Sequence, residues 1–125
     1  MFQVHADSKN NLLWIEFNKQ LTFKDILQCL KRVYNERKNF ESAYSSIVKL
    51  NENLVFVDEA QPRIDLTIFS GKFHRLKKTV IVYPEHCKTS KRTAEKLQQI
   101  YTQCDALSYL AVSEIEAKRL LGILW

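Results

Sequence analysis

Short apolar runs alternate with amphipathic stripes along this chain, and this alternation restricts the possible folds more than any other feature. Runs rich in β-branched and aromatic residues, typical of strands, lie at residues 2–6, 11–18, 47–57, 79–83 and 107–112. Apolar residues at helical spacing lie in residues 23–38, 62–76, 90–101 and 113–124. Strands that alternate with helices favour right-handed crossovers and a parallel sheet. The sequence therefore predicts an α/β fold.

The predicted element order is β-β-α-β-α-β-α-β-α, within a single domain over residues 1–125. The polar stretch Asp7–Asn11 suits a hairpin turn between the first two strands. We therefore expect a mainly parallel five-stranded sheet with an N-terminal antiparallel hairpin, covered by helices. Leu54–Val57 is apolar on both faces, as in a central strand. Pro62 suits the start of a helix whose apolar stripe ends at Leu76.

The net charge of +5 comes entirely from the second half of the chain. Residues 1–62 carry eight basic and eight acidic residues, whereas residues 63–125 carry eleven and six. The segment Lys72–Lys96 alone has eight basic and two acidic residues. Such an excess attracts anions, so an anionic ligand or a nucleic acid is an expected partner.

Composition and cysteine content also bear on localisation. No stretch approaches the roughly 18 to 20 apolar residues of a membrane-spanning helix, and Met1–Asp7 lacks the pattern of a signal peptide. The three cysteines, Cys29, Cys87 and Cys104, cannot all pair within one chain. They are therefore expected to be thiols in a reducing compartment, which predicts a cytoplasmic protein.

The carboxyl ends of parallel strands and the starts of the following helices form the predicted ligand site. Ser90 is expected to cap the helix over residues 90–101, and free N–H groups there favour anions. The predicted anion-binding residues are Lys88, Thr89, Ser90, Lys91 and Arg92. The expected rim of strand ends contains Asp58, Glu59, His86 and Ser113. The alternative is an ordinary capped helix whose charged side chains are solvated.

Catalytic and metal-binding patterns are weak. His86 and Cys87 are adjacent, but neighbouring side chains rarely face each other, and no third group orients them. His5 and His74 are far from His86 in the sequence, and no pair of residues has metal-ligand spacing. The sequence therefore predicts no catalytic residues, no metal, no cofactor and no enzymatic activity.

Several segments together resemble the STAS family, the sulfate-transporter and anti-sigma-factor-antagonist domain, and especially its stand-alone bacterial branch. The resemblance lies in residues 12–17, 21–25, 54–58, 79–83 and 109–125. It implies protein–protein regulation or sensing of a small ligand. The family's antagonists carry a phosphorylatable hydroxyl after the third long strand, whereas Asp58–Arg63 has none. The family's phosphorylation switch therefore does not transfer to this position.

We expect a non-enzymatic regulatory or protein-interaction module of STAS-like type, with a small anion bound at the strand ends. The alternative is a basic protein that binds nucleic acid with Lys72–Lys96. Trp125 either closes the core or contributes to an apolar patch of a homodimer, and the sequence leaves both open.

Overall fold

The computed structural model describes residues 2–18, 20–21, 23–36, 40, 43–51, 55–56, 76–103 and 107–122. Five strands form the main sheet, in the spatial order β1 (Phe2–Asp7), β2 (Leu12–Phe17), β4 (Tyr44–Leu50), β6 (Leu76–Val82) and β7 (Leu107–Ala111). The β1–β2 pair is antiparallel, and the other three pairs are parallel. The predicted α/β fold with an N-terminal hairpin is confirmed.

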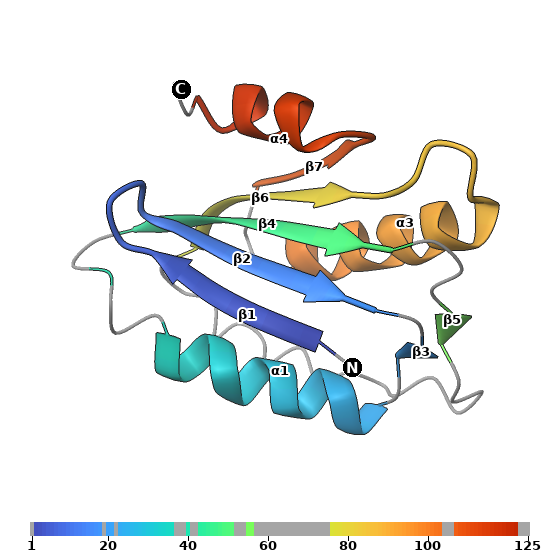
Figure 1. Cartoon of the computed structure of the whole chain (residues 1–125), viewed down its shortest axis with the longest axis horizontal. Coiled ribbons are helices and arrows are strands. Elements are labelled where there is room, and N and C mark those ends of the chain that lie inside the picture. Colours follow the sequence, from blue (N-terminus) through green and yellow to red (C-terminus); the bar gives the residue numbers. More distant parts are fainter. Residues whose placement is uncertain are drawn as a thin grey trace.

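Helices pack on both faces of this sheet (Figure 1). α1 (Phe23–Glu36) and α3 (Lys88–Gln103) lie on one face, and α4 (Glu114–Leu120) lies on the other. The larger core, beneath α1 and α3, includes Val33, Val48, Ile81 and Ala94. The smaller core lies beneath α4, and its residues are Leu12, Ile47, Val80, Val82, Ala111 and Ala117. Side chains of successive strand residues enter opposite cores, which explains the apolar runs on β4 and β6.

The hairpin turn follows the predicted chemistry. The Asp7 carboxylate accepts hydrogen bonds from the side-chain amide of Asn10 at 2.8 Å and from its backbone N–H at 3.3 Å. The side-chain hydrogen bond from Asn10 is the main cause that lowers the pKa of Asp7. Asn11 has a φ of 49°, in the left-handed region that asparagine tolerates better than most residues.

The prediction that Leu54–Val57 forms a central strand is wrong for Val55 and Phe56, the two of these residues that the structure describes. β5 (Val55–Phe56) pairs with β3 (Gln20–Leu21) in a separate two-stranded sheet, and β4 is the central strand of the main sheet. The predicted strand began at residue 47, whereas β4 begins at Tyr44. Ser45 and Ser46 are polar, so the apolar pattern of the sequence did not include the start of this strand. The buried Ser46 hydroxyl donates to Thr79 Oγ1 at 2.7 Å, so a polar residue fits inside the sheet.

Leu76 was expected at the end of a helix, but it is the first residue of β6. The rest of that predicted helix, from Pro62, lies outside the described residues, as does Trp125. Leu76 is buried in the larger core, so its apolar side chain fits a strand as well as a helical stripe. A short apolar pattern does not by itself distinguish these two settings.

Candidate functional site

Four parallel strands end at the same edge of the main sheet, here called the carboxyl edge (Figure 1). The backbone N–H of Tyr83 donates to the carbonyl of Ala111 at 3.0 Å, which joins the ends of β6 and β7. The loop over residues 83–87 and the turn over residues 112–113 therefore leave the sheet side by side. The helices that follow them, α3 and α4, turn to opposite faces.

Asn51 connects three elements at the carboxyl edge. Its backbone N–H and its side-chain amide both donate to the carbonyl of Phe17, at 3.3 and 3.0 Å. The same amide donates to the Glu16 carboxylate at 3.2 Å and to the side-chain oxygen of Asn18. The Ser90 hydroxyl donates to the Asn51 carbonyl at 2.9 Å. One hydrogen-bonded network thus links the ends of β2 and β4 to the first turn of α3.

The expectation that Ser90 caps its helix is wrong. α3 begins at Lys88, and the carbonyl of Cys87 accepts the first helical hydrogen bond, from the Lys91 N–H at 3.0 Å. Ser90 lies in the first turn and is 0% exposed. Its hydroxyl therefore serves the fold and is not presented to a ligand at the surface.

The other predicted anion-binding residues are exposed at the start of α3: Lys88, Thr89, Lys91 and Arg92. Three of them are cations within five consecutive residues, so they create a local positive potential. Their role in binding an anion stays a prediction. The network through Asn51 and Ser90 fixes the helix turn from which these side chains extend.

The predicted rim residues have different environments. Asp58 and Glu59 lie outside the described residues. Ser113 is the N-cap of α4, and its hydroxyl accepts from the Glu116 N–H at 3.1 Å. His86 is exposed in the turn between β6 and α3.

Cys87 follows His86 in that turn and is half-buried. Its backbone N–H donates to the carbonyl of Pro84 at 3.0 Å, which closes the turn. Within the described residues, no group of three or more histidine, cysteine or acidic side chains is arranged to hold a metal ion.

The basic segment Lys72–Lys96 is divided by β6. Lys77 and Lys78 lie in the amino-terminal half of this strand, whereas α3 begins beyond its carboxyl end. At about 3.3 Å per residue, the part of β6 beyond Lys78 separates these two groups by roughly 13 Å. The described basic residues at the start of α3 are therefore a surface of their own, here called the α3 basic cluster and defined as Lys88, Lys91 and Arg92.

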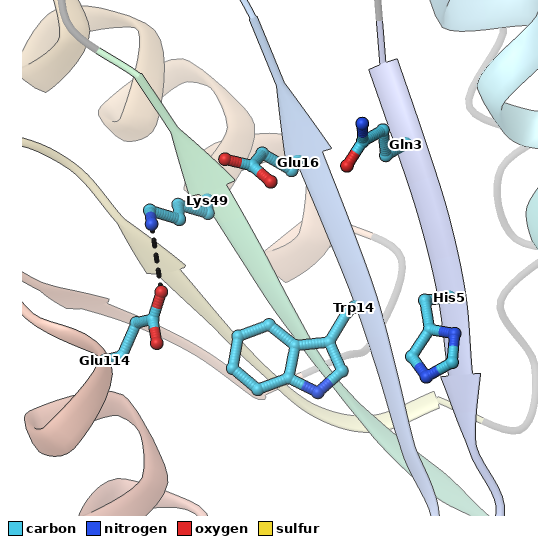
Figure 2. Close-up of a pocket in the computed structure, with 6 residues that line it drawn as sticks. All are labelled: Gln3, His5, Trp14, Glu16, Lys49 and Glu114. Atoms are coloured by element: carbon cyan, nitrogen blue, oxygen red, sulfur yellow. Dashed lines mark hydrogen bonds and ion pairs between the residues drawn. The ribbon is translucent and has the colours of Figure 1, made fainter.

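A second candidate site lies on the sheet face that carries α4. It is a hollow of about 280 Å³ whose lining residues are Gln3, His5, Trp14, Glu16, Lys49 and Glu114 (Figure 2). The Trp14 indole lies across the sheet, and the polar groups surround it. This arrangement combines one aromatic surface with acceptors and donors of both charges. Such a surface can contact a ligand that carries both polar and apolar groups.

Two contacts hold α4 beside this hollow. Lys49 Nζ lies 2.9 Å from Glu114 Oε1, and the ammonium of Lys118 lies 5.3 Å from the ring centre of Trp14. The hydrogen bond that Lys49 donates to Glu114 is the main cause that raises the pKa of Lys49, although partial burial opposes it. Both contacts are on the side of α4 that faces β2 and β4.

Sequence reasoning missed this hollow, although the strand pattern contained a signal. Gln3 and His5 alternate with inward-facing residues on β1, and Trp14 and Glu16 do so on β2. In the antiparallel register Gln3 pairs with Glu16 and His5 pairs with Trp14, so all four share one face. The contribution of Glu114 required the position of α4, which a strand pattern does not give.

No helix among the described residues is long and apolar enough to span a membrane. Comparisons with family models, with curated proteins and with solved structures found no match to this chain.

Proposed function

We propose that this chain is a non-enzymatic regulatory module of STAS-like type that binds an acidic partner protein through the α3 basic cluster. The observation that carries the proposal is the exposure of Lys88, Lys91 and Arg92 on the first turns of one helix at the carboxyl edge. The antiparallel hairpin that opens a parallel sheet is also what the STAS resemblance implies.

The α3 basic cluster is suited to a folded acidic surface for two reasons. The helix supplies a rigid spacing of the three cations, because Ser90 and Asn51 fix its first turn. The cluster is also small, and Glu95 follows it on the same exposed part of α3. A nucleic-acid surface usually continues positive charge along the path of the backbone, whereas the described basic residues here are divided by β6.

Affinity capture from the native lysate tests the proposal with three forms of the chain. The first is the wild type, and the second is Lys88→Ala/Lys91→Ala/Arg92→Ala. The third, Lys9→Ala/Lys31→Ala/Lys77→Ala, is a matched control that removes the same charge from exposed positions elsewhere. We expect one acidic protein in the wild-type and control captures, at least tenfold depleted in the cluster variant.

The same captures distinguish the alternative. Recovery that is abolished by nuclease, and that falls by orders of magnitude between low and physiological salt, would support nucleic-acid binding and contradict the proposal. Equal recovery of the partner by the cluster variant and the wild type would also contradict it, because the three cations would then contribute nothing.

A further inference from the structure

The hollow beside Trp14 presents hydrogen-bonding groups that have no partner in the described part of the chain. The amide of Gln3 and the imidazole of His5 line it, are exposed, and make no hydrogen bond with a described residue. One oxygen of the Glu16 carboxylate accepts from the Asn51 amide at 3.2 Å, and its other oxygen accepts nothing from the described residues. These donors and acceptors are therefore available to a ligand.

Strand register places three of the lining side chains in one row across the sheet. Glu16 on β2 pairs with Gln3 on β1 and with Lys49 on β4, so the order across the strands is Lys49, Glu16, Gln3. Lys49 gives one N–H to Glu114 at 2.9 Å and keeps its other two. With strands about 4.8 Å apart, the row is roughly 9.6 Å long, so it can contact several polar atoms along one edge of a ligand. The row offers a donor, then an acceptor, then an amide that can do either.

Trp14 gives a ligand a flat aromatic surface beside this row. It lies two residues before Glu16 on β2, so roughly 6.6 Å separates the two Cα atoms. Figure 2 shows the indole on one side of the hollow, with Gln3 and Glu16 on the other. Aromatic rings stack favourably on an indole in an offset arrangement. The volume of about 280 Å³ lies just below the usual range for larger ligands and suits a fused two-ring group.

The chain's own lysines occupy the positions that would attract a cationic ligand. The Lys49 ammonium pairs with the Glu114 carboxylate, and the Lys118 ammonium lies 5.3 Å from the centre of the Trp14 ring. Glu16 and Glu114 carry two negative charges and these two lysines carry two positive ones, so the four charges balance. A cation would have to displace one of the lysines, whereas a neutral ring would not. The charges therefore favour a neutral ligand.

We propose that the hollow beside Trp14 binds a neutral fused heterocycle that presents a carbonyl oxygen, a ring N–H and an amino group along one edge, as guanine and pterins do. The carbonyl oxygen accepts from Lys49, the ring N–H donates to Glu16, and the amino group donates to Gln3 or Glu16. The ring stacks on the exposed part of the indole. This site is separate from the α3 basic cluster, because α3 lies on the other face of the sheet (Figure 1).

Calorimetric titration with guanosine tests the order of donors and acceptors. Guanosine is uncharged, so the α3 basic cluster has no anion to attract. Inosine lacks the amino group, and adenosine has no carbonyl oxygen, so each loses at least one of the proposed hydrogen bonds. We expect a guanosine Kd below about 1 mM and values about fivefold weaker for inosine and adenosine. Binding of pterin as well would show that the edge is sufficient, whereas binding of guanosine alone would assign a nucleoside whose ribose contributes.

Two substitutions test the contacts with this edge. Glu16→Gln keeps an oxygen that can accept from Asn51 but replaces the other acceptor with a donor, and it should weaken guanosine binding about tenfold. Gln3→Ala changes an exposed side chain, so it is expected to fold and to weaken binding about threefold. Glu95→Gln, at an exposed position on α3, is the matched control and should bind as the wild type does. Circular dichroism verifies the fold of each variant.

Fluorescence tests the stacking on Trp14. The chain has two tryptophans, so Trp125→Phe leaves Trp14 as the only indole. We expect guanosine to quench the fluorescence of this variant, with the same Kd that calorimetry gives. Ribose alone, which has no ring to stack, should leave the fluorescence unchanged. Binding of guanosine without any change in this fluorescence would contradict the proposed position of the ring.

Three further results would overturn the proposal. One is the absence of binding by both guanosine and pterin up to about 1 mM. Another is equal affinity for guanosine and adenosine, or equal affinity of the wild type and Glu16→Gln for guanosine, because the edge would then not be recognised. The third is tighter binding of tetramethylammonium than of guanosine, which would make the hollow a cation site.

This proposal and the proposed function can fail separately. Lys88→Ala/Lys91→Ala/Arg92→Ala leaves every residue of the hollow unchanged, so it should bind guanosine as the wild type does. Glu16→Gln should still capture the acidic partner, because Glu16 is not part of the α3 basic cluster. Loss of guanosine binding in the triple variant would contradict the position of the ligand beside Trp14.

Discussion

At the scale of single residues, Ser90 shows how a polar group that resembles a ligand contact can serve the fold. Its hydroxyl is fully buried and donates to the Asn51 carbonyl. Ser90→Ala would leave this carbonyl without that donor, and we expect a loss of about 1 kcal/mol of unfolding free energy in urea. The neighbouring Thr89 is exposed, so Thr89→Ala should change stability by less than about 0.5 kcal/mol. Equal losses in both variants would contradict this role of Ser90.

The buried thiol of Cys29 is expected to make the unfolding free energy depend on pH in the alkaline range. Burial raises the pKa of its thiol to about 12, although the charge of Arg32 opposes this rise, and the ordinary value is 9.0. Between these values the unfolded chain releases a proton that the folded chain keeps. The stabilising contribution of the neutral thiol is therefore full below pH 9.0 and is lost as pH rises towards 12.

The pKa of Lys49 is also raised from its ordinary value of 10.5, chiefly by its hydrogen bond with Glu114. The contribution of this hydrogen bond to stability is therefore also lost as pH rises above 10.5. We expect the unfolding free energy of the wild type to fall above pH 9.0, and that of Cys29→Ala to fall less steeply. Urea titrations at several pH values measure both slopes. Parallel slopes would show that Cys29 does not titrate on unfolding in this range.

At the scale of elements, α4 is short and depends on its cap. It has seven residues, and Ser113 accepts the Glu116 N–H at 3.1 Å from an extended backbone conformation. Ser113→Ala should cost about 1 kcal/mol, measured by urea unfolding and by faster amide exchange in α4. Ser113→Asp keeps an acceptor at the N-cap and adds a favourable charge there, so it should retain the stability of the wild type. If Ser113→Asp lost as much as Ser113→Ala, the cap would not be the cause.

The elements that the sequence predicted well are those with a local and unambiguous pattern. The hairpin with its Asn-rich turn, and the helix predicted from residue 113, which the structure has as α4, depend on near neighbours in the chain. The start of β4 was missed because Ser46 is satisfied by Thr79, a partner 33 residues away. The start of α3 was misplaced because Ser90 is a common capping residue whose actual partner, Asn51, is 39 residues away.

At the scale of the whole molecule, the sequence predicted which loops meet at the carboxyl edge but not what the edge presents. A parallel sheet fixes the common side of the strand ends, so the grouping of residues 83–88 with Ser113 followed from topology. The hollow beside Trp14 was not foreseen, because it depends on how far α4 extends across the sheet and on the pairing of Lys49 with Glu114. The position of α4 and the Lys49–Glu114 pair both arise from packing between elements that are distant in the sequence.

The α3 basic cluster is separable from the contacts that hold the fold. Lys88, Lys91 and Arg92 are exposed, whereas Ser90 between them is buried and donates to the Asn51 carbonyl. Lys88→Ala/Lys91→Ala/Arg92→Ala should therefore abolish capture of the acidic partner, while each substitution changes the unfolding free energy by less than about 0.5 kcal/mol. Affinity capture and urea unfolding of the same variant measure both effects. Loss of the partner together with a large loss of stability would contradict this separation, because the three cations would then contribute to the fold.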